Sequence, residues 1–169
     1  RSAATFDELN AELQKPNSFV DHILLKLLQE KIDLSNPTLV AFSVPFPGNL
    51  YSAFKCAQYL KKQYPELKIA MGGGFPNTEL RSLSDPRVFD YFDFILLDDG
   101  EAPILNLVEY LDGNRSKADL KRTFALENGD VVYLNGSLQN DFSQFESGTP
   151  DYSDFLLDSY LSVIEIVNP

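Results

Sequence analysis

The chain has little of the chemistry from which many protein sites are built. Its 169 residues include one cysteine, one histidine and no tryptophan. The single cysteine, Cys56, excludes an internal disulfide framework and a cysteine-rich zinc site. The single histidine, His22, excludes a metal site with two histidine ligands inside the chain. Nucleophilic and metal-centred chemistry therefore has few candidate residues.

Positive charge and long apolar runs are also scarce. Lys and Arg number 14 against 25 Asp and Glu, so the net charge is −11. This argues against a nucleic-acid partner, which needs a basic patch, and against docking on anionic lipid. The longest apolar runs, such as residues 94–97, fall far short of the ~20 residues that span a bilayer. With no signal segment at the start, we expect a cytoplasmic domain, and the opening Arg1 indicates a fragment of a longer protein.

The rest of the composition is that of a globular domain, with 44% apolar and 23% charged residues. Apolar periodicity and breakers then predict an alternation of strands and helices. The segment 38–43 is apolar throughout, which is typical of a buried parallel strand. The predicted elements are helices at 5–14, 18–32, 49–63 and 101–111, strands at 38–43, 67–71 and 91–97, and short helical turns within 77–90.

Three of these helices carry clear apolar stripes. In 49–63 the stripe consists of Leu50, Ala53, Phe54, Ala57 and Leu60. In 18–32 the stripe consists of Val20, Ile23, Leu24, Leu27 and Leu28. In 101–111 we expect the inward side chains to be Ile104, Leu105, Val108 and Leu111. The alternation predicts an α/β fold: a Rossmann-like (flavodoxin-like) three-layer parallel sheet, incomplete, with N-terminal helices.

A β-hairpin is predicted after this alternation. Asn128-Gly129 lies between the segments 122–126 and 131–134, and Asn-Gly between alternating residues is a strong hairpin signal. Residues 137–152 read as an extended, weakly ordered segment. The predicted organisation is a helical segment 1–36, an α/β core 37–114, a hairpin 115–136 and a linker 137–169.

Three unusual segments follow the three predicted parallel strands. They are 43–48, 72–76 and 98–101, and in an open α/β sheet they would meet at the carboxyl edge, where ligands bind. The triplet Gly72-Gly73-Gly74 offers bare backbone to a ligand, or forms only a tight turn. It matches neither Gly-x-Gly-x-x-Gly nor a phosphate-binding P-loop. The acidic turn with Asp98, Asp99 and Glu101 could hold Mg²⁺, or simply cap a helix in solvent.

No catalytic set is recognisable. Ser43 has no base to activate it, His22 is expected at the surface, and Cys56 is expected to be a partly buried structural thiol. We therefore expect a binding domain rather than a self-sufficient catalyst.

The spacing of two motifs resembles a known family. Ser43-x-Pro45 is followed by 26 residues and then Gly72-Gly73, which is similar to the Ser-x-Leu…Gly-Gly part of cobalamin-binding domains. Gly100-Glu101 resembles the end of a Gly-Glu-Gly-Glu turn in the branch joined to radical S-adenosylmethionine (radical SAM) enzymes. The segment 150–161 looks like the linker that leads into the radical SAM barrel.

The resemblance implies a cobalamin cofactor and a set of contacts for it. Ser43, Gly72, Gly73 and Gly74 would line the nucleotide tail of the corrinoid. Gly100 and Glu101 would close the edge of the crevice. The apolar wall would be formed by Val44, Pro45, Phe46 and Phe75. The family's Asp-x-His-x-x-Gly motif is absent, so no histidine of the protein would ligate cobalt. The [4Fe–4S] cluster and S-adenosylmethionine would belong to a barrel outside this chain, in a larger protein that is a radical SAM enzyme.

Three functions are thus open. The first is a cobalamin-binding, or degenerate cobalamin-binding-like, accessory domain of a radical SAM enzyme, with the barrel as its partner in cis. The second is a ligand-free structural module that packs on the barrel or self-associates through an open sheet edge. The third is a small Mg²⁺-dependent enzyme using Asp98, Asp99 and Glu101.

Overall fold

A computed structural model describes residues 6–143 and 145–153 of the chain. Two helices, α1 (Phe6–Leu13) and α2 (Phe19–Ser35), precede the sheet. Strands β1 (Leu39–Ser43), β2 (Lys68–Gly72) and β3 (Phe94–Leu96) follow, joined through α3 (Leu50–Gln63), the short α4 (Gly74–Glu79) and the 3₁₀ turns Pro47–Asn49 and Pro86–Asp90. Helix α5 (Glu101–Leu111), a 3₁₀ turn at Lys117–Asp119, and strands β4 (Thr123–Glu127) and β5 (Asp130–Leu134) complete the fold.

In the described residues the five strands form one sheet in sequence order. β1, β2 and β3 are parallel, whereas β4 and β5 are antiparallel. The predicted α/β class is confirmed, but the sheet is mixed rather than parallel, because the hairpin continues it instead of standing apart. Asn128 and Gly129 both have positive φ, as a type I′ turn requires.

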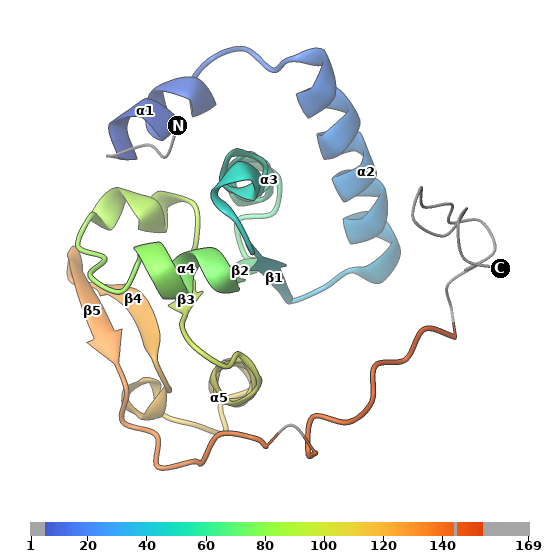
Figure 1. Ribbon diagram of the computed structural model, residues 1–169. Helices are drawn as coiled ribbons and strands as arrows, with labels where there is room; N and C mark the ends of the chain where they lie inside the picture. The colour runs from blue at the N-terminus through green and yellow to red at the C-terminus, as the bar shows by residue number, and fades with distance from the viewer. Residues whose placement is uncertain (1–5, 144, 154–169) are drawn as a thin grey trace, which may run out of the picture.

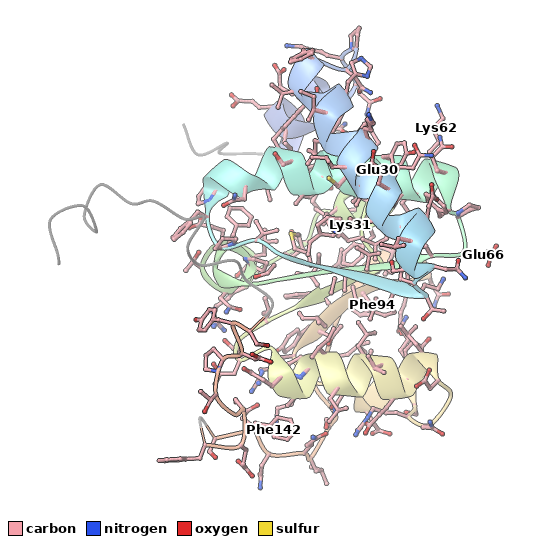
Figure 2. All side chains as sticks on the ribbon, turned by 90° about the vertical axis from the view of Figure 1, so that its right-hand side faces the viewer. Glu30, Lys31, Lys62, Glu66, Phe94 and Phe142 are labelled. Atoms are coloured by element: carbon pink, nitrogen blue, oxygen red, sulfur yellow. The ribbon has the colours of Figure 1, made fainter. Side chains whose placement is uncertain are left out.

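Helices cover both faces of the sheet, giving three layers (Figures 1 and 2). The larger core lies under α1 and α3, where the Phe54 ring meets Phe6 in a tilted contact and Tyr91 and Phe92 in edge-to-face contacts. The smaller core lies under α5 around Phe94, Leu107 and Leu120. α3 follows its predicted stripe, burying Ala53, Phe54, Ala57 and Leu60.

Strand β1 differs from the prediction. It pairs only with β2 among the described strands, so it is an edge strand, and Ala41 and Ser43 are exposed. A run apolar on both faces is thus not enough to indicate a central strand. β3 is also shorter than the predicted 91–97, because Tyr91 is still in the turn that follows Pro86–Asp90.

Helix α5 is rotated relative to the prediction. Its buried residues are Ala102, Pro103, Asn106 and Leu107, whereas Leu105 and Val108 are exposed. The tail that follows β5 explains the rotation: the Asn106 amide donates a hydrogen bond to Gln139 Oε1 at 2.6 Å. A polar side chain therefore faces inward, where a sequence stripe favours only apolar ones.

The tail itself is partly anchored. Lys121 Nζ donates to the carbonyl of Gln139, and Arg122 makes two hydrogen bonds to Asp141 at 2.8 and 2.5 Å. Residues 137–141 are therefore fixed to the domain through side chains, although they form no strand or helix. The predicted linker motif at 150–161 lies largely outside the described residues, as does residue 5 of the first predicted helix.

Candidate functional site

The three segments singled out in the sequence do meet at the carboxyl edge of the parallel strands. Ser43 and Gly72 are register partners at the ends of β1 and β2. The third segment is joined to them through α4. The Asn77 side chain accepts a hydrogen bond from the Asp98 backbone N–H and donates one to the Asp98 carbonyl at 3.4 Å.

The first two segments contact each other directly through their backbones. The Val44 N–H donates to Gly72 O at 2.8 Å, and the Phe75 N–H donates to Val44 O at 2.9 Å. A Cβ at Gly73 would lie 2.8 Å from Val44 N, and one at Gly74 would lie 2.8 Å from Pro45 O. Gly73 also has φ +100°, a conformation that disfavours any other residue. These two glycines are therefore needed for loop-to-loop packing, whatever else the edge binds.

Some of the remaining predicted contact residues are buried, whereas others are exposed. Val44 is 1% exposed and packs in the larger core, and Phe75 is half-buried against the same core. Ser43, Pro45 and the 68%-exposed Phe46 face solvent. Gly100 and Glu101 are exposed at the start of α5, where the negative charge of Glu101 complements the helix dipole. The predicted contact residues with exposed side chains or backbone are thus Ser43, Pro45, Phe46, Gly74, Gly100 and Glu101.

The acidic turn does not form a carboxylate cluster. Asp98 is in ion-pair contact with Arg81 and lies 3.5 Å from the Arg122 guanidinium. Within residues 6–143 and 145–153, no three Asp, Glu, His or Cys side chains are grouped to hold a metal ion. Because arginines neutralise Asp98, this geometry does not support the Mg²⁺-dependent enzyme.

Arg122, like Asn77 and Arg81, contacts the acidic turn and was not predicted from the sequence. It has φ +44° and donates to the Asp99 carbonyl at 3.3 Å as well as to Asp141. Hydrogen bonding to Asp141 raises the pKa of the Arg122 guanidinium, so its charge is fixed. Arg122 ties the acidic turn to the anchored tail. The basic pair Lys121-Arg122 before the hairpin was the available signal, but its acidic partner is 19 positions away.

The single cysteine and histidine lie where they were expected. Cys56 is buried and free, and burial, with the nearby Asp21 charge, raises the pKa of its thiol to about 11. A thiol with that pKa is a poor nucleophile at neutral pH. His22 is exposed on α2 and belongs to none of the three edge segments.

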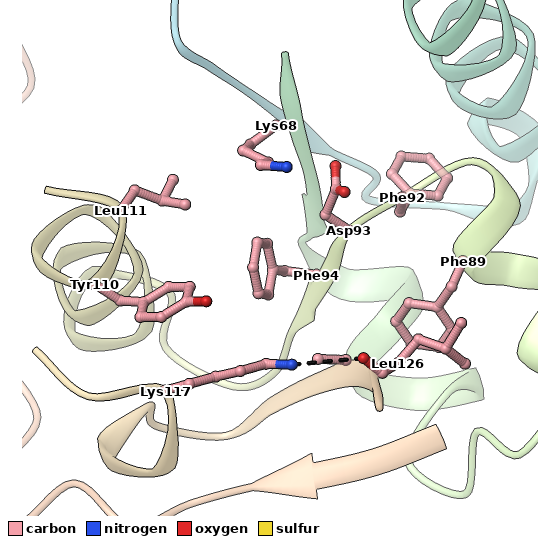
Figure 3. A pocket seen from close by; sticks show the side chains of 10 residues that line it. Lys68, Phe89, Phe92, Asp93, Phe94, Tyr110, Leu111, Lys117 and Leu126 are labelled. Carbon is pink, nitrogen blue, oxygen red and sulfur yellow. Dashed lines mark hydrogen bonds between the residues drawn. The ribbon is translucent and has the colours of Figure 1, made fainter. Parts of the chain in front are cut away.

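A pocket of about 280 Å³ lies at the opposite, amino-terminal end of β2 and β3 (Figure 3). Phe94, Tyr110 and Leu111 form its apolar side, and the Tyr110 hydroxyl points inward. The carboxylate of Asp93, which also lines the pocket, already has two partners. It accepts a hydrogen bond from the Ile69 N–H at 2.8 Å and forms an ion pair with Lys61 at 2.8 Å. No sequence motif predicts this pocket, because its lining residues come from six separate elements.

Comparison with known proteins adds no assignment: no protein-family model matches the chain, and no curated protein matches it. Among the described residues, no helix is long and apolar enough to cross a bilayer.

Proposed function

We propose that the chain is a cobalamin-binding-like accessory domain with a Rossmann-like core, serving a cytoplasmic radical SAM enzyme whose barrel lies outside it. The observation that carries the proposal is the register of Ser43 with Gly72, which places the Ser-x-Pro and Gly-Gly motifs side by side at the carboxyl edge. That edge is where ligands of open α/β sheets bind. The acidic turn is held at the same edge by the hydrogen bonds between Asn77 of α4 and the Asp98 backbone.

The residues fit a corrinoid only in part. The exposed Ser43, Pro45, Phe46, Gly100 and Glu101 are available for contact. Gly73 and Gly74 face the neighbouring loop, and Val44 faces the core. A nucleotide tail would therefore lie along the exposed rim and not between the loops of β1 and β2. Cobalamin, when bound, would supply alkyl-transfer chemistry at its cobalt; this chain would position the corrinoid without a histidine ligand.

A second candidate, a ligand-free structural module, is favoured by one specific observation. The backbone contacts of Val44 with Gly72 and Phe75 close the space between the first two loops. In that case the same packing keeps the domain rigid while an outer surface contacts the barrel. The two candidates differ in whether the exposed rim holds a corrinoid.

A cobalamin titration separates them. The chain is mixed with hydroxocobalamin, passed through gel filtration, and its visible absorption is recorded. Retained corrinoid with a base-off spectrum supports the binding domain. Ser43→Tyr, which fills the rim, should then reduce retention at least tenfold, while Ser52→Tyr, the same change at an exposed position on α3, should not. Loss of corrinoid from the wild type on the column favours the ligand-free module.

A further inference from the structure

Helix α2 presents an apolar face to solvent. Five large apolar side chains on it are between 46% and 83% exposed: Phe19, Val20, Ile23, Leu27 and Leu34. Its inner side is less apolar than this, because Asp21 is buried there with Leu25 and Ile32. A surface helix of a globular protein normally buries its apolar side chains and exposes its polar ones. A contiguous exposed apolar face of this kind marks an interaction site.

The buried residues Asp21, Leu25 and Ile32 set the orientation of this helix. The Asp21 carboxylate accepts hydrogen bonds from the Ser18 N–H at 2.7 Å, the Ser18 hydroxyl at 2.8 Å and the Tyr51 hydroxyl at 3.2 Å. Ser18 also caps the helix through the Asp21 N–H. Tyr51 is the only one of these donors that belongs to another helix, so rotating α2 to bury Val20 and Leu27 would break its hydrogen bond to Asp21. The same rotation would expose Leu25 and Ile32, which are buried on the inner side of α2. The apolar face is therefore held outward.

The spacing on this face is self-complementary. Val20, Leu27 and Leu34 recur at intervals of seven, the period at which side chains form a seam along a helix. If a second α2 runs antiparallel with Leu27 opposite Leu27, Val20 of each helix lies opposite Leu34 of the other. A two-fold axis of this kind uses one patch twice, as closed dimers do.

The charges of α2 allow two copies of the chain to come together along this helix, whereas the charge of the rest of the chain opposes their association. The whole chain carries −11, which drives copies apart. On the exposed part of α2, Lys26 and Lys31 balance Glu30 and Asp33, and Lys26 lies 4.0 Å from Glu30. Figure 2 shows α2 crossing the front of the molecule, with Glu30 and Lys31 along it. The apolar face thus coincides with a locally neutral one.

We propose that the chain self-associates through α2, with two copies packed antiparallel about a two-fold axis at Leu27. The occupant of the apolar face is thus a second copy of the chain. This inference goes beyond the cobalamin proposal and does not depend on it, since the association is measured without corrinoid.

Light scattering after gel filtration, and sedimentation equilibrium, test the proposal over micromolar concentrations. The wild type should form a dimer. Leu27→Glu places two carboxylates at the axis and should weaken dimerisation at least a hundredfold, giving monomer. Leu105→Glu is the matched control, because Leu105 is an exposed leucine on α5, and it should leave the dimer intact. Thermal melting by circular dichroism should show both variants folded.

Disulfide trapping tests the antiparallel register. Under oxidation Leu27→Cys should cross-link to itself. Leu34→Cys should not, but should cross-link to Val20→Cys when the two variants are mixed. The native Cys56 does not compete, because it is buried. A wild type that stays monomeric, a dimer that survives Leu27→Glu, or self-cross-linking of Leu34→Cys would each overturn the proposal.

Discussion

The two ends of the parallel strands are built in opposite ways. At the carboxyl edge, the loops after β1 and β2 are joined by their own backbones, through the pairs Val44–Gly72 and Phe75–Val44. At the amino edge, side chains leave a pocket of about 280 Å³ beside Phe94 and Tyr110. Ligands of α/β sheets bind at the carboxyl edge, yet here that edge is the better packed. The fold therefore predicts at which edge a ligand binds, whereas the packing of the loops determines how much of that edge is accessible.

Gly73→Ala should have the largest effect on stability, because Gly73 lies where the two loops of the carboxyl edge come closest. The new Cβ would lie 2.8 Å from Val44 N and 2.9 Å from Val44 O, at φ +100°. Strain and overpacking together should lower the free energy of unfolding by about 2–4 kcal/mol. Urea denaturation measures this. Gly48→Ala, where nothing lies within 4 Å, should change it by less than about 1 kcal/mol; equal effects would mean that the edge is not closed as described.

Asp93→Ala should have a smaller effect at the amino edge. It removes the acceptor of the Ile69 N–H, which lies in a fully buried residue, and leaves Lys61 without its ion pair. An unsatisfied buried N–H costs about 1–3 kcal/mol in the free energy of unfolding. The same denaturation experiment on Asp90→Ala, an exposed neighbour, should give a change near zero. If Asp93→Ala is as mild as Asp90→Ala, the rim of the pocket is not held by this carboxylate.

The sequence predicted the elements better than their orientation. Periodicity located α3 and its buried stripe, and Asn128-Gly129 located the hairpin, because both signals are local. It misjudged which face of α5 is buried, since that depends on the pairing of Asn106 with Gln139, 33 residues away. It could not show that β1 is an edge strand, because an apolar run contains no information about its neighbours.

The candidate site follows the same division. The convergence of 43–48, 72–76 and 98–101 could be predicted from the alternation of strands and helices, which places the ends of parallel strands at one edge. That Gly73 and Gly74 face another loop, and that Arg81 and Arg122 neutralise Asp98, could not. A glycine in the sequence indicates that another group can come close to the backbone, but not whether that group is a ligand or a neighbouring loop. Only the three-dimensional structure distinguishes the two.

Acid titration should give the smallest effect, and it reports on the carboxyl-edge side through Asp21. Tyr51 at the start of α3, the helix that follows the β1 loop, donates to this carboxylate. Burial alone raises the pKa of Asp21, but hydrogen bonds from Ser18 and Tyr51 and the charge of Lys55 outweigh it, so the pKa lies below its usual value. As the pH falls below about 4, the unfolded chain therefore binds a proton first, and the free energy of unfolding decreases until the folded pKa is passed.

Denaturation of the wild type and Asp21→Asn across the acid range isolates this contribution. The wild type should be the more stable above pH ~5, and the difference should shrink as the pH falls, by less than the slope of one full proton. Asp90→Asn should follow the wild-type curve. A difference that does not change with pH would show that Asp21 stabilises the fold without a contribution from its ionised carboxylate, which would contradict the lowered pKa.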